Sequence, residues 1–360
     1  MRITPDLSLR TDISTVSANG RYRIPTGGSA PNPFVSLTLT NLKKEIYAYG
    51  FRNPHRLSWD PIANSLVADD IGLHSWEEVD IIHPGGNYGY AEREGTEQLF
   101  VTTDSSTNGK TNSQLGMPFP SNDSLVVNGL ANPVTPLYPV ANYSHRDGDA
   151  IAGGFVYRGS LLSPLYGKYI FGDITTGRIF YSDFGDMLAA DDGNRTTLAG
   201  IHELQIVFNG VKRRVFDVIS DKYHQKGGNA TGEALPGGCG GLNTGGNDPE
   251  GVPYGCGRAD IRLAVGGDGE LYLLSKSDGM VRKFTAVLIP PTISSIHITN
   301  GVVTLSWPSI QNVTYRVQYK TSLTETGWTD LAGDVTATST TASKTDSPTD
   351  AARFYRLKAL

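Results

Sequence analysis

Cysteines, long apolar runs and clustered positive charge are scarce in this chain of 360 residues. The only two cysteines, Cys239 and Cys256, exclude a small disulfide-dense scaffold. They flank a Gly/Asn-rich stretch, and a disulfide between them would restrict the unfolded chain by roughly 3 kcal/mol. Two free thiols are the alternative, because two cysteines alone do not fix the redox compartment.

No apolar run approaches the roughly 18 residues that a bilayer-spanning helix needs, so no membrane span is expected. Residues 1–6 lack the apolar core of a signal peptide, so we expect no export signal in the chain as written. The net charge is −5 and the basic residues are scattered. Nucleic acid is therefore not an expected partner, because no basic patch is present for a phosphate backbone.

Long stretches with the 3.6-residue period of amphipathic helices are also missing, which excludes the crossover helices of a parallel α/β sheet. Instead, 42 glycines and 20 prolines separate short apolar and aromatic runs. Residues 60–69, 177–181 and 267–274 repeat one pattern, a polar turn followed by such a run. This predicts an all-β protein of antiparallel hairpins. A β-propeller is favoured over a single sandwich because residues 1–286 are many for one sandwich.

A change of composition at residues 289–291, Ile-Pro-Pro, marks the expected domain boundary. We assign residues 1–286 to the propeller and residues 290–360 to a second domain. In the second domain, residues 315–320 and 355–358 alternate between aromatic or aliphatic and charged side chains, as half-buried strands do. This predicts a small fibronectin-like β-sandwich that carries no recognisable chemistry.

Three motifs in the first domain follow one another closely: residues 45–56 (EIYAYGFRNPHR), 76–82 (WEEVDII) and 85–90 (GGNYGY). In order and spacing they resemble the glucose/sorbosone dehydrogenase family, which includes soluble quinoprotein sugar dehydrogenases and hedgehog-interacting proteins. Further matches lie at residues 153–159, 167–173 and 268–272. The resemblance implies a six-bladed-type β-propeller that binds pyrroloquinoline quinone (PQQ) and calcium.

Arg52 and Asn53 directly follow Gly50 and Phe51 in the first motif. A guanidinium group can fork onto a carboxylate or an ortho-quinone, and an amide adds further hydrogen bonds. The resemblance implies that Arg52 and Asn53 contact PQQ. In the alternative, Arg52 holds a neighbouring carboxylate within the fold and Pro54 fixes a turn.

Five carboxylates fall within twelve residues: Asp69, Asp70, Glu77, Glu78 and Asp80. Hard oxygen donors at this density suit Ca²⁺ better than Zn²⁺, and crowding without a metal would raise some of their pKa values. The resemblance implies that the carbonyls of Gly72 and Leu73 bind a calcium that bridges to PQQ. It also implies a structural calcium site at Glu77, Glu78 and Tyr88. The alternative is a solvated acidic loop.

Residues 142–149 place aromatic, imidazole and carboxylate groups before a Gly-Gly pair. We expect this segment to wall a substrate pocket through Tyr143 and His145. The alternative for His145 is an ordinary surface histidine, since a lone loop histidine is more often that than a base.

Two departures from the family pattern bear on activity. In the quinoprotein enzymes an early-blade histidine is the general base while hydride passes to PQQ. Residues 2–6 and 19–25 match a portion of the family that follows the first blades. We therefore expect that histidine to lie upstream of Met1 and the propeller of this chain to be incomplete. Such a fragment would self-associate through its open sheet edge. The later blades of the family supply a lysine and a pair of arginines that hold the cofactor. Here the turn that matches the lysine reads Thr175-Thr176, and Arg258 alone remains of the arginine pair.

Two functions follow from these patterns. The first is a PQQ- and calcium-dependent dehydrogenase that oxidises a sugar hydroxyl by hydride transfer to the quinone, periplasmic or secreted in the intact parent and inactive as this fragment. The second is a non-catalytic, calcium-stabilised propeller that binds glycan or protein partners. The Arg-Asn pair and the carboxylates favour the first function, whereas the missing lysine, arginine and histidine favour the second.

Overall fold

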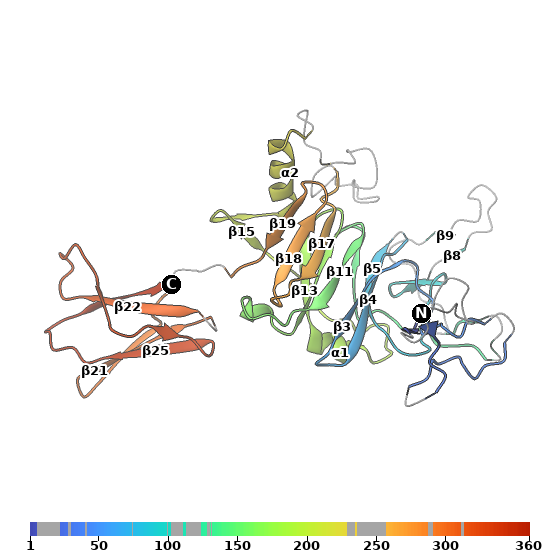
Figure 1. The fold of residues 1–360 in the computed structure, drawn as a ribbon, viewed down its shortest axis with the longest axis horizontal. Helices are drawn as coiled ribbons and strands as arrows, with labels where there is room; N and C mark the ends of the chain where they lie inside the picture. Colours follow the sequence, from blue (N-terminus) through green and yellow to red (C-terminus); the bar gives the residue numbers. More distant parts are fainter. Residues whose placement is uncertain are drawn as a thin grey trace. The chain divides into compact units, whose positions relative to one another are not determined.

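The computed structural model describes residues 1–5, 22–27, 30–39, 42–73, 75–98, 100–101, 111–112, 124–127, 130, 132–228, 235, 257–286, 291–310 and 313–360. These residues form mainly antiparallel strands, with α-helices only at α1 and α2 within the described part (Figure 1). The all-β prediction is therefore confirmed. The predicted disulfide cannot be placed, because Cys239 and Cys256 lie outside the described residues.

The first sheet has the order β10-β5-β4-β3 and consists of β3 (Pro54–Asp60), β4 (Ser65–Asp70), β5 (Trp76–Ile81) and β10 (Ala141–Ser144). Its register pairs Asp70 with Glu78 and Ala68 with Asp80. Because successive side chains of a strand point to opposite faces, Glu78 and Asp80 share one face and Glu77 points to the other.

The second sheet, in the order β11-β12-β13-β14, is a meander of β11 (Ile151–Val156), β12 (Lys168–Asp173), β13 (Ile179–Asp183) and β14 (His202–Glu203). The third contains β17 (Ile261–Val265), β18 (Leu271–Ser275) and β19 (Met280–Lys283). Antiparallel sheets of three or four sequential strands are the blade type of a β-propeller (Figure 1). The number of blades in the whole ring stays a prediction.

The core between the first two sheets combines aliphatic side chains with a group of aromatic rings. Tyr143 of β10 packs against Phe171 of β12 and Phe180 of β13, with ring centroids 6.3 and 5.1 Å away. Gly153 of β11, at φ +93°, lies against Arg56, and a Cβ there would be 2.6 Å from the Arg56 Cβ. Only glycine therefore fits at this crossing of β11 and β3.

Helix α1 (Phe184–Ala190) begins at Asp183, whose side chain accepts a hydrogen bond from the Gly185 N–H at 3.0 Å. Helix α2 (Val215–Gln225) buries Val215, Phe216, Val218 and Ile219. The remaining short elements outside the C-terminal strands are β1 (Thr4–Pro5), β2 (Tyr22–Arg23), β6 (Arg93–Glu94), β7 (Glu97–Gln98), β8 (Phe100–Val101), β9 (Thr111–Asn112), the 3-10 helix Ser163–Leu165, β15 (Ile206–Phe208) and β16 (Val211–Arg213).

The C-terminal strands form two sheets, one of β20-β21-β25 and one in which β22 pairs with β23, β24 and β26. Their bounds are β20 (Ser295–Thr299), β21 (Val302–Pro308), β22 (Thr314–Lys320), β23 (Thr329–Asp330), β24 (Val335–Thr336), β25 (Thr341–Asp346) and β26 (Phe354–Ala359). Leu305, Trp307, Tyr315 and Val317 form their core. The predicted strands at residues 315–320 and 355–358 are present, whereas the fibronectin class stays a prediction.

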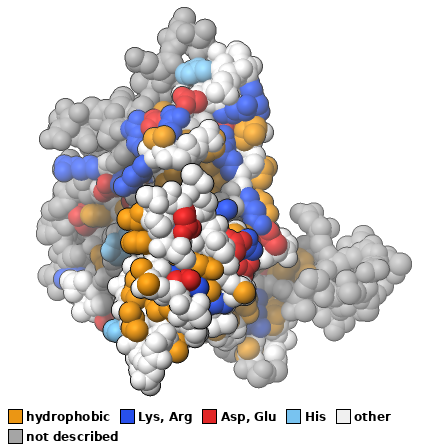
Figure 2. Space-filling view, turned by 90° about the vertical axis from the view of Figure 1, so that its left-hand side faces the viewer, with side chains coloured by type: hydrophobic (Ala, Val, Ile, Leu, Met, Phe, Trp, Pro, Cys, Tyr) orange, Lys and Arg blue, Asp and Glu red, His pale blue; other side chains and the backbone are white. Residues whose placement is uncertain are grey.

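The chain divides into two compact units. The first contains Met1–Val156, Gly167–Ala264 and Leu273–Val281, and the second contains Tyr157–Tyr166, Val265–Tyr272 and Arg282–Leu360. The expected boundary between residues 286 and 290 therefore stays a prediction, because the second unit includes two earlier segments. Within the described residues no helix is long and apolar enough to span a bilayer. On the face shown in Figure 2, acidic and basic side chains are interspersed with hydrophobic and uncharged polar ones.

Candidate metal and ligand site

Three buried carboxylates, Asp70, Glu78 and Asp80, meet on one face of the first sheet, and we call them the carboxylate trio. One oxygen from each lies within 4.8 Å of the others. Both carboxylate oxygens of Asp80 are buried and have no hydrogen-bond partner in the part of the chain that the structure describes. Unpaired buried carboxylate oxygens are costly, so this arrangement calls for a bound cation or for protonation.

The electrostatics of the trio agree with its geometry. Burial raises the pKa of Asp70 to about 6, against the opposing effect of its backbone hydrogen bonds. Burial, followed by neighbouring carboxylates, raises the pKa values of Glu78 and Asp80 well above their usual range. Among the described residues, no Lys, Arg or His forms an ion pair with any of the three. A hard divalent cation matches such an all-oxygen donor set.

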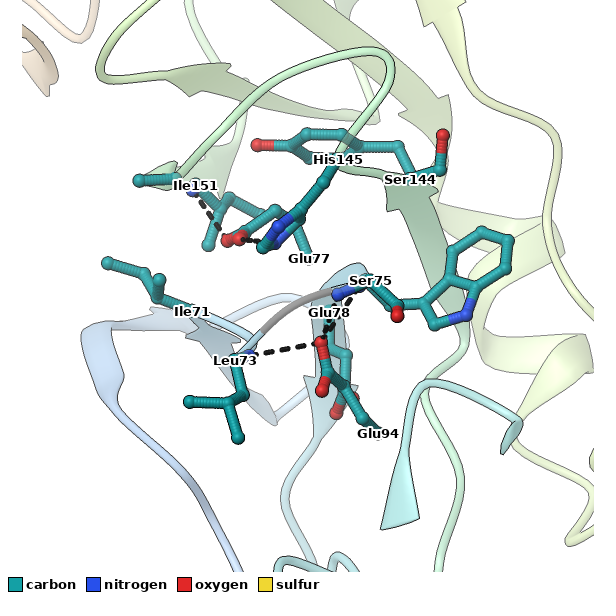
Figure 3. Close-up of polar contacts among 12 residues, drawn as sticks. Ile71, Leu73, Ser75, Glu77, Glu78, Glu94, Ser144, His145 and Ile151 are labelled. Atoms are coloured by element: carbon teal, nitrogen blue, oxygen red, sulfur yellow. Dashed lines mark hydrogen bonds and ion pairs between the residues drawn. The ribbon is translucent and has the colours of Figure 1, made fainter. Parts of the chain in front are cut away.

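The structure does not bring the predicted calcium ligands Glu77, Glu78 and Tyr88 together. Glu77 points to the opposite face, where its Oε1 lies 2.7 Å from Nε2 of His145 and its Oε2 accepts the Ile151 N–H at 2.8 Å (Figure 3). The Tyr88 hydroxyl donates to the Ile81 carbonyl at 2.7 Å. Glu78 is instead grouped with Asp70 and Asp80, which the sequence analysis included in the acidic cluster but not in the site.

The loop that contains Gly72 and Leu73 is wrapped around Glu94. The Glu94 Oε1 accepts backbone N–H groups of Leu73 at 3.0 Å, Ser75 at 2.6 Å and Trp76 at 3.0 Å (Figure 3). A Cβ on Gly72 would be 1.7 Å from the Trp76 carbonyl oxygen, so this turn requires glycine. Glu94 is a functional candidate that the sequence motifs did not predict, although three glutamates lie within residues 92–97.

Arg52 and Asn53 are joined to the trio through Asp70. The Arg52 backbone N–H donates to its Oδ2 at 2.8 Å, and the Asn53 backbone N–H donates to its Oδ1 at 2.6 Å. The Arg52 guanidinium donates to the Ile71 carbonyl at 3.3 Å. A trio carboxylate therefore fixes the turn that carries the predicted quinone-binding pair.

The 142–149 segment lies beside the same charged groups. Burial lowers the pKa of His145, and the positive charge of Arg52 lowers it further. Burial and then Asp173 raise the pKa of Asp149 to about 6, while Arg258 opposes this. Two guanidinium groups, Arg52 and Arg258, thus lie within electrostatic range of this segment. Tyr143 is buried and donates to Asp173 Oδ2 at 3.0 Å.

The Thr175–Thr176 turn offers no cation. Both backbone N–H groups and the Thr176 hydroxyl donate to Asp173 Oδ1, at 3.0, 2.8 and 2.8 Å. The turn therefore closes on a carboxylate of its own sheet, where the resemblance places a cofactor-binding lysine.

Comparisons with known proteins support the resemblance. The family model "Glucose / Sorbosone dehydrogenase" matches residues 15–187. The HIPL1 protein of Arabidopsis thaliana is 32% identical over 182 residues, which cover 48% of this chain and 22% of that protein. The aldose sugar dehydrogenase YliI of Escherichia coli (strain K12) is 33% identical over 70 residues, 19% of this chain and 18% of that protein. The chain spans about a fifth of the length of these curated relatives.

Solved sugar dehydrogenases are similar at lower identity. The apo-form soluble aldose sugar dehydrogenase from Escherichia coli shares 16% identity and a TM-score of 0.38, covering 77% of this chain and 56% of that one. The PQQ-bound aldose sugar dehydrogenase from Streptomyces coelicolor shares 20% identity and a TM-score of 0.26, covering 44% and 32%. The family model and the curated relatives agree, so residues 15–187 are similar to the glucose/sorbosone dehydrogenase family.

Proposed function

We propose that this chain is the calcium-binding part of a sugar dehydrogenase that uses PQQ, in a parent protein that is periplasmic or secreted. The observation that carries the proposal is the buried carboxylate trio, in which the two oxygens of Asp80 have no hydrogen-bond partner among the residues described. Asp70, Glu78 and Asp80 would hold the calcium. Its binding would compensate the buried negative charge that otherwise raises their pKa values.

In this proposal, Arg52, Asn53 and Arg258 form the part of the site that binds the quinone. PQQ carries carboxylates beside its ortho-quinone, and guanidinium groups bind such an edge in charge-assisted pairs. When bound, PQQ would supply the acceptor for the hydride of the sugar. Asp70 links the two parts of the site, because its carboxylate holds the backbone of Arg52 and Asn53. Calcium bound at Asp70 would therefore fix the position of Arg52 as well.

The test is a calcium titration of the purified chain, followed by melting temperature and calorimetry. We expect calcium to raise the melting temperature, because it binds the folded state alone. Glu78→Gln should abolish this shift. Glu77→Gln is the matched control, since the neighbouring glutamate faces the other side of the strand and should leave the shift intact. Equal shifts in both variants would refute the site.

PQQ is then added to the calcium-loaded chain, and binding is followed by absorbance and calorimetry. Saturable binding that Arg52→Gln weakens by about tenfold or more would support the dehydrogenase. Calcium binding without any PQQ binding would instead identify a calcium-stabilised propeller of the non-catalytic kind, and the proposal of a quinone enzyme would then fall.

A further inference from the structure

A separate cavity of about 360 Å³ opens at the outer strands of the first two sheets. Its walls include the aromatic rings of Trp76, Tyr143 and Phe180, and the polar side chains of Asn142, Arg178 and Glu203. β10 and β14, which supply part of the wall, are each the last strand of their sheet. We infer that this cavity binds one neutral sugar ring.

The charged side chains of the rim are paired with one another. Arg178 Nη1 lies 3.1 Å from Asp147 Oδ1 and Nη2 lies 2.9 Å from Glu203 Oε2, and the guanidinium carbon is 4.8 Å from the centre of the Phe180 ring. The Arg178 side chain is only 15% exposed, so it is held in this arrangement. A cation already paired with two carboxylates does not attract an anion. The rim therefore favours a neutral ligand that offers both hydrogen-bond donors and acceptors.

Two donors in the cavity wall lack acceptors. Trp76 Nε1 and Asn142 Nδ2 are both buried without a hydrogen-bond partner among the described residues. Both side chains pack against Gly95, where a Cβ would lie 2.7 Å from Trp76 Cγ and 3.0 Å from Asn142 Nδ2. Unpaired buried donors need an explanation in a folded protein. We expect the hydroxyl and ring oxygens of a bound sugar to accept hydrogen bonds from these two side chains.

Size and chemistry together select a sugar. A volume of about 360 Å³ is near the lower end of ligand pockets, which excludes a large cofactor and suits one pyranose. Arg178 lies over the Phe180 ring and Tyr143 packs against Phe180, so Trp76 is the wall ring that we expect to pack against the C–H face of a sugar. The sugar hydroxyls require the mixed donors and acceptors of the rim. Apolar ligands would leave those polar groups without partners.

This cavity is distinct from the candidate metal and quinone site. None of the carboxylate trio, Arg52 or His145 lines it. Tyr143 lines this cavity and His145 does not, although the two were predicted to share a substrate pocket. Sugar binding at this cavity requires neither calcium nor PQQ. Its test is therefore independent of the test of the proposed function.

The test uses methyl β-D-glucopyranoside with the full chain, because this glycoside has no free anomeric hydroxyl to oxidise. Saturation-transfer NMR and calorimetry are recorded in the presence of a chelator. We expect binding with a dissociation constant on the order of 1 mM. Asn142→Ala should weaken binding by about tenfold, and Trp76→Phe, which keeps an aromatic face but removes the N–H, should weaken it as well.

His202→Ala is the matched control, because His202 lies beside Glu203 on β14 but stacks on Tyr181, with ring centroids 5.1 Å apart, and does not line the cavity. It should bind the glycoside as the unmodified chain does. Circular dichroism melts establish that each variant is folded. The inference is overturned if no saturation transfer occurs, if the chelator abolishes binding, or if Asn142→Ala and His202→Ala bind equally.

Discussion

His145 Nε2 lies 2.7 Å from Oε1 of Glu77, a β5 residue whose side chain has no exposed surface. The second Glu77 oxygen accepts the Ile151 N–H at 2.8 Å. The pair therefore ties the 142–149 segment to β5 and to the start of β11.

We predict that His145→Ala destabilises the protein by about 1–3 kcal/mol, because it leaves a buried carboxyl group short of a partner. Glu77→Gln should cost less, since its amide can donate to His145 while its oxygen accepts from Ile151. Urea unfolding of both variants measures the difference. A surface histidine with no structural role would give His145→Ala an effect close to zero.

A second prediction concerns Glu94, which accepts three backbone N–H groups from the loop around Gly72. Glu94→Ala should destabilise the protein by about 2–4 kcal/mol, because these donors lose their acceptor together. Glu94→Gln is the control, since its oxygen can still accept them. If the loop carbonyls contribute to the calcium site, Glu94→Ala also weakens calcium binding in calorimetry. Unchanged stability of Glu94→Ala would contradict the anchoring role.

Sequence patterns predict several strands and the acidic cluster, but they do not predict which distant residues pair with one another in the fold. Alternation of apolar and polar residues locates β22 and β26, and the acidic cluster points to a cation. Strand pleating places the side chains of Glu77 and Glu78 on opposite faces of the sheet, which the sequence reveals only once their strand is recognised. Glu94 and His145 owe their roles to contacts with residues 18 to 68 positions away, and local patterns carry no signal for these.

The third prediction is a pH dependence at Asp149, whose pKa burial raises from 3.8 to about 6. Between these values the folded state binds more protons at this carboxyl than the unfolded state does, so its contribution to stability is lost as the pH rises through about 6. Asp149→Asn should therefore be more stable than the unmodified protein at pH 7.5 and show no such gain near pH 4. Urea unfolding across this range tests it. Asp192→Asn, at an exposed aspartate, should show no comparable pattern.

A fourth prediction tests the crossing of β11 and β3. Gly153→Ala should destabilise the protein by about 2 kcal/mol or more, because alanine at φ +93° is strained and its Cβ meets the Arg56 side chain. Part of this loss should return in the double variant with Arg56→Ala, which removes the side-chain atoms beyond Cβ. Thermal unfolding gives the comparison. Additive losses in the double variant would mean that the Arg56 atoms beyond Cβ are not the cause.

The last prediction is that residues 290–360 fold on their own. Their two sheets enclose Trp307 and Leu305, both with no exposed surface, and a core of this kind supports an independent domain. The isolated segment should give dispersed amide NMR signals and a cooperative melt. Trp307→Ala should cost about 3–5 kcal/mol and abolish that melt. Trp328→Ala is the control, because Trp328 is only partly buried and packs against Lys320 and Arg356. Collapsed signals from the isolated segment would show instead that the folding unit includes Tyr157–Tyr166 and Val265–Tyr272, the earlier segments grouped with these strands.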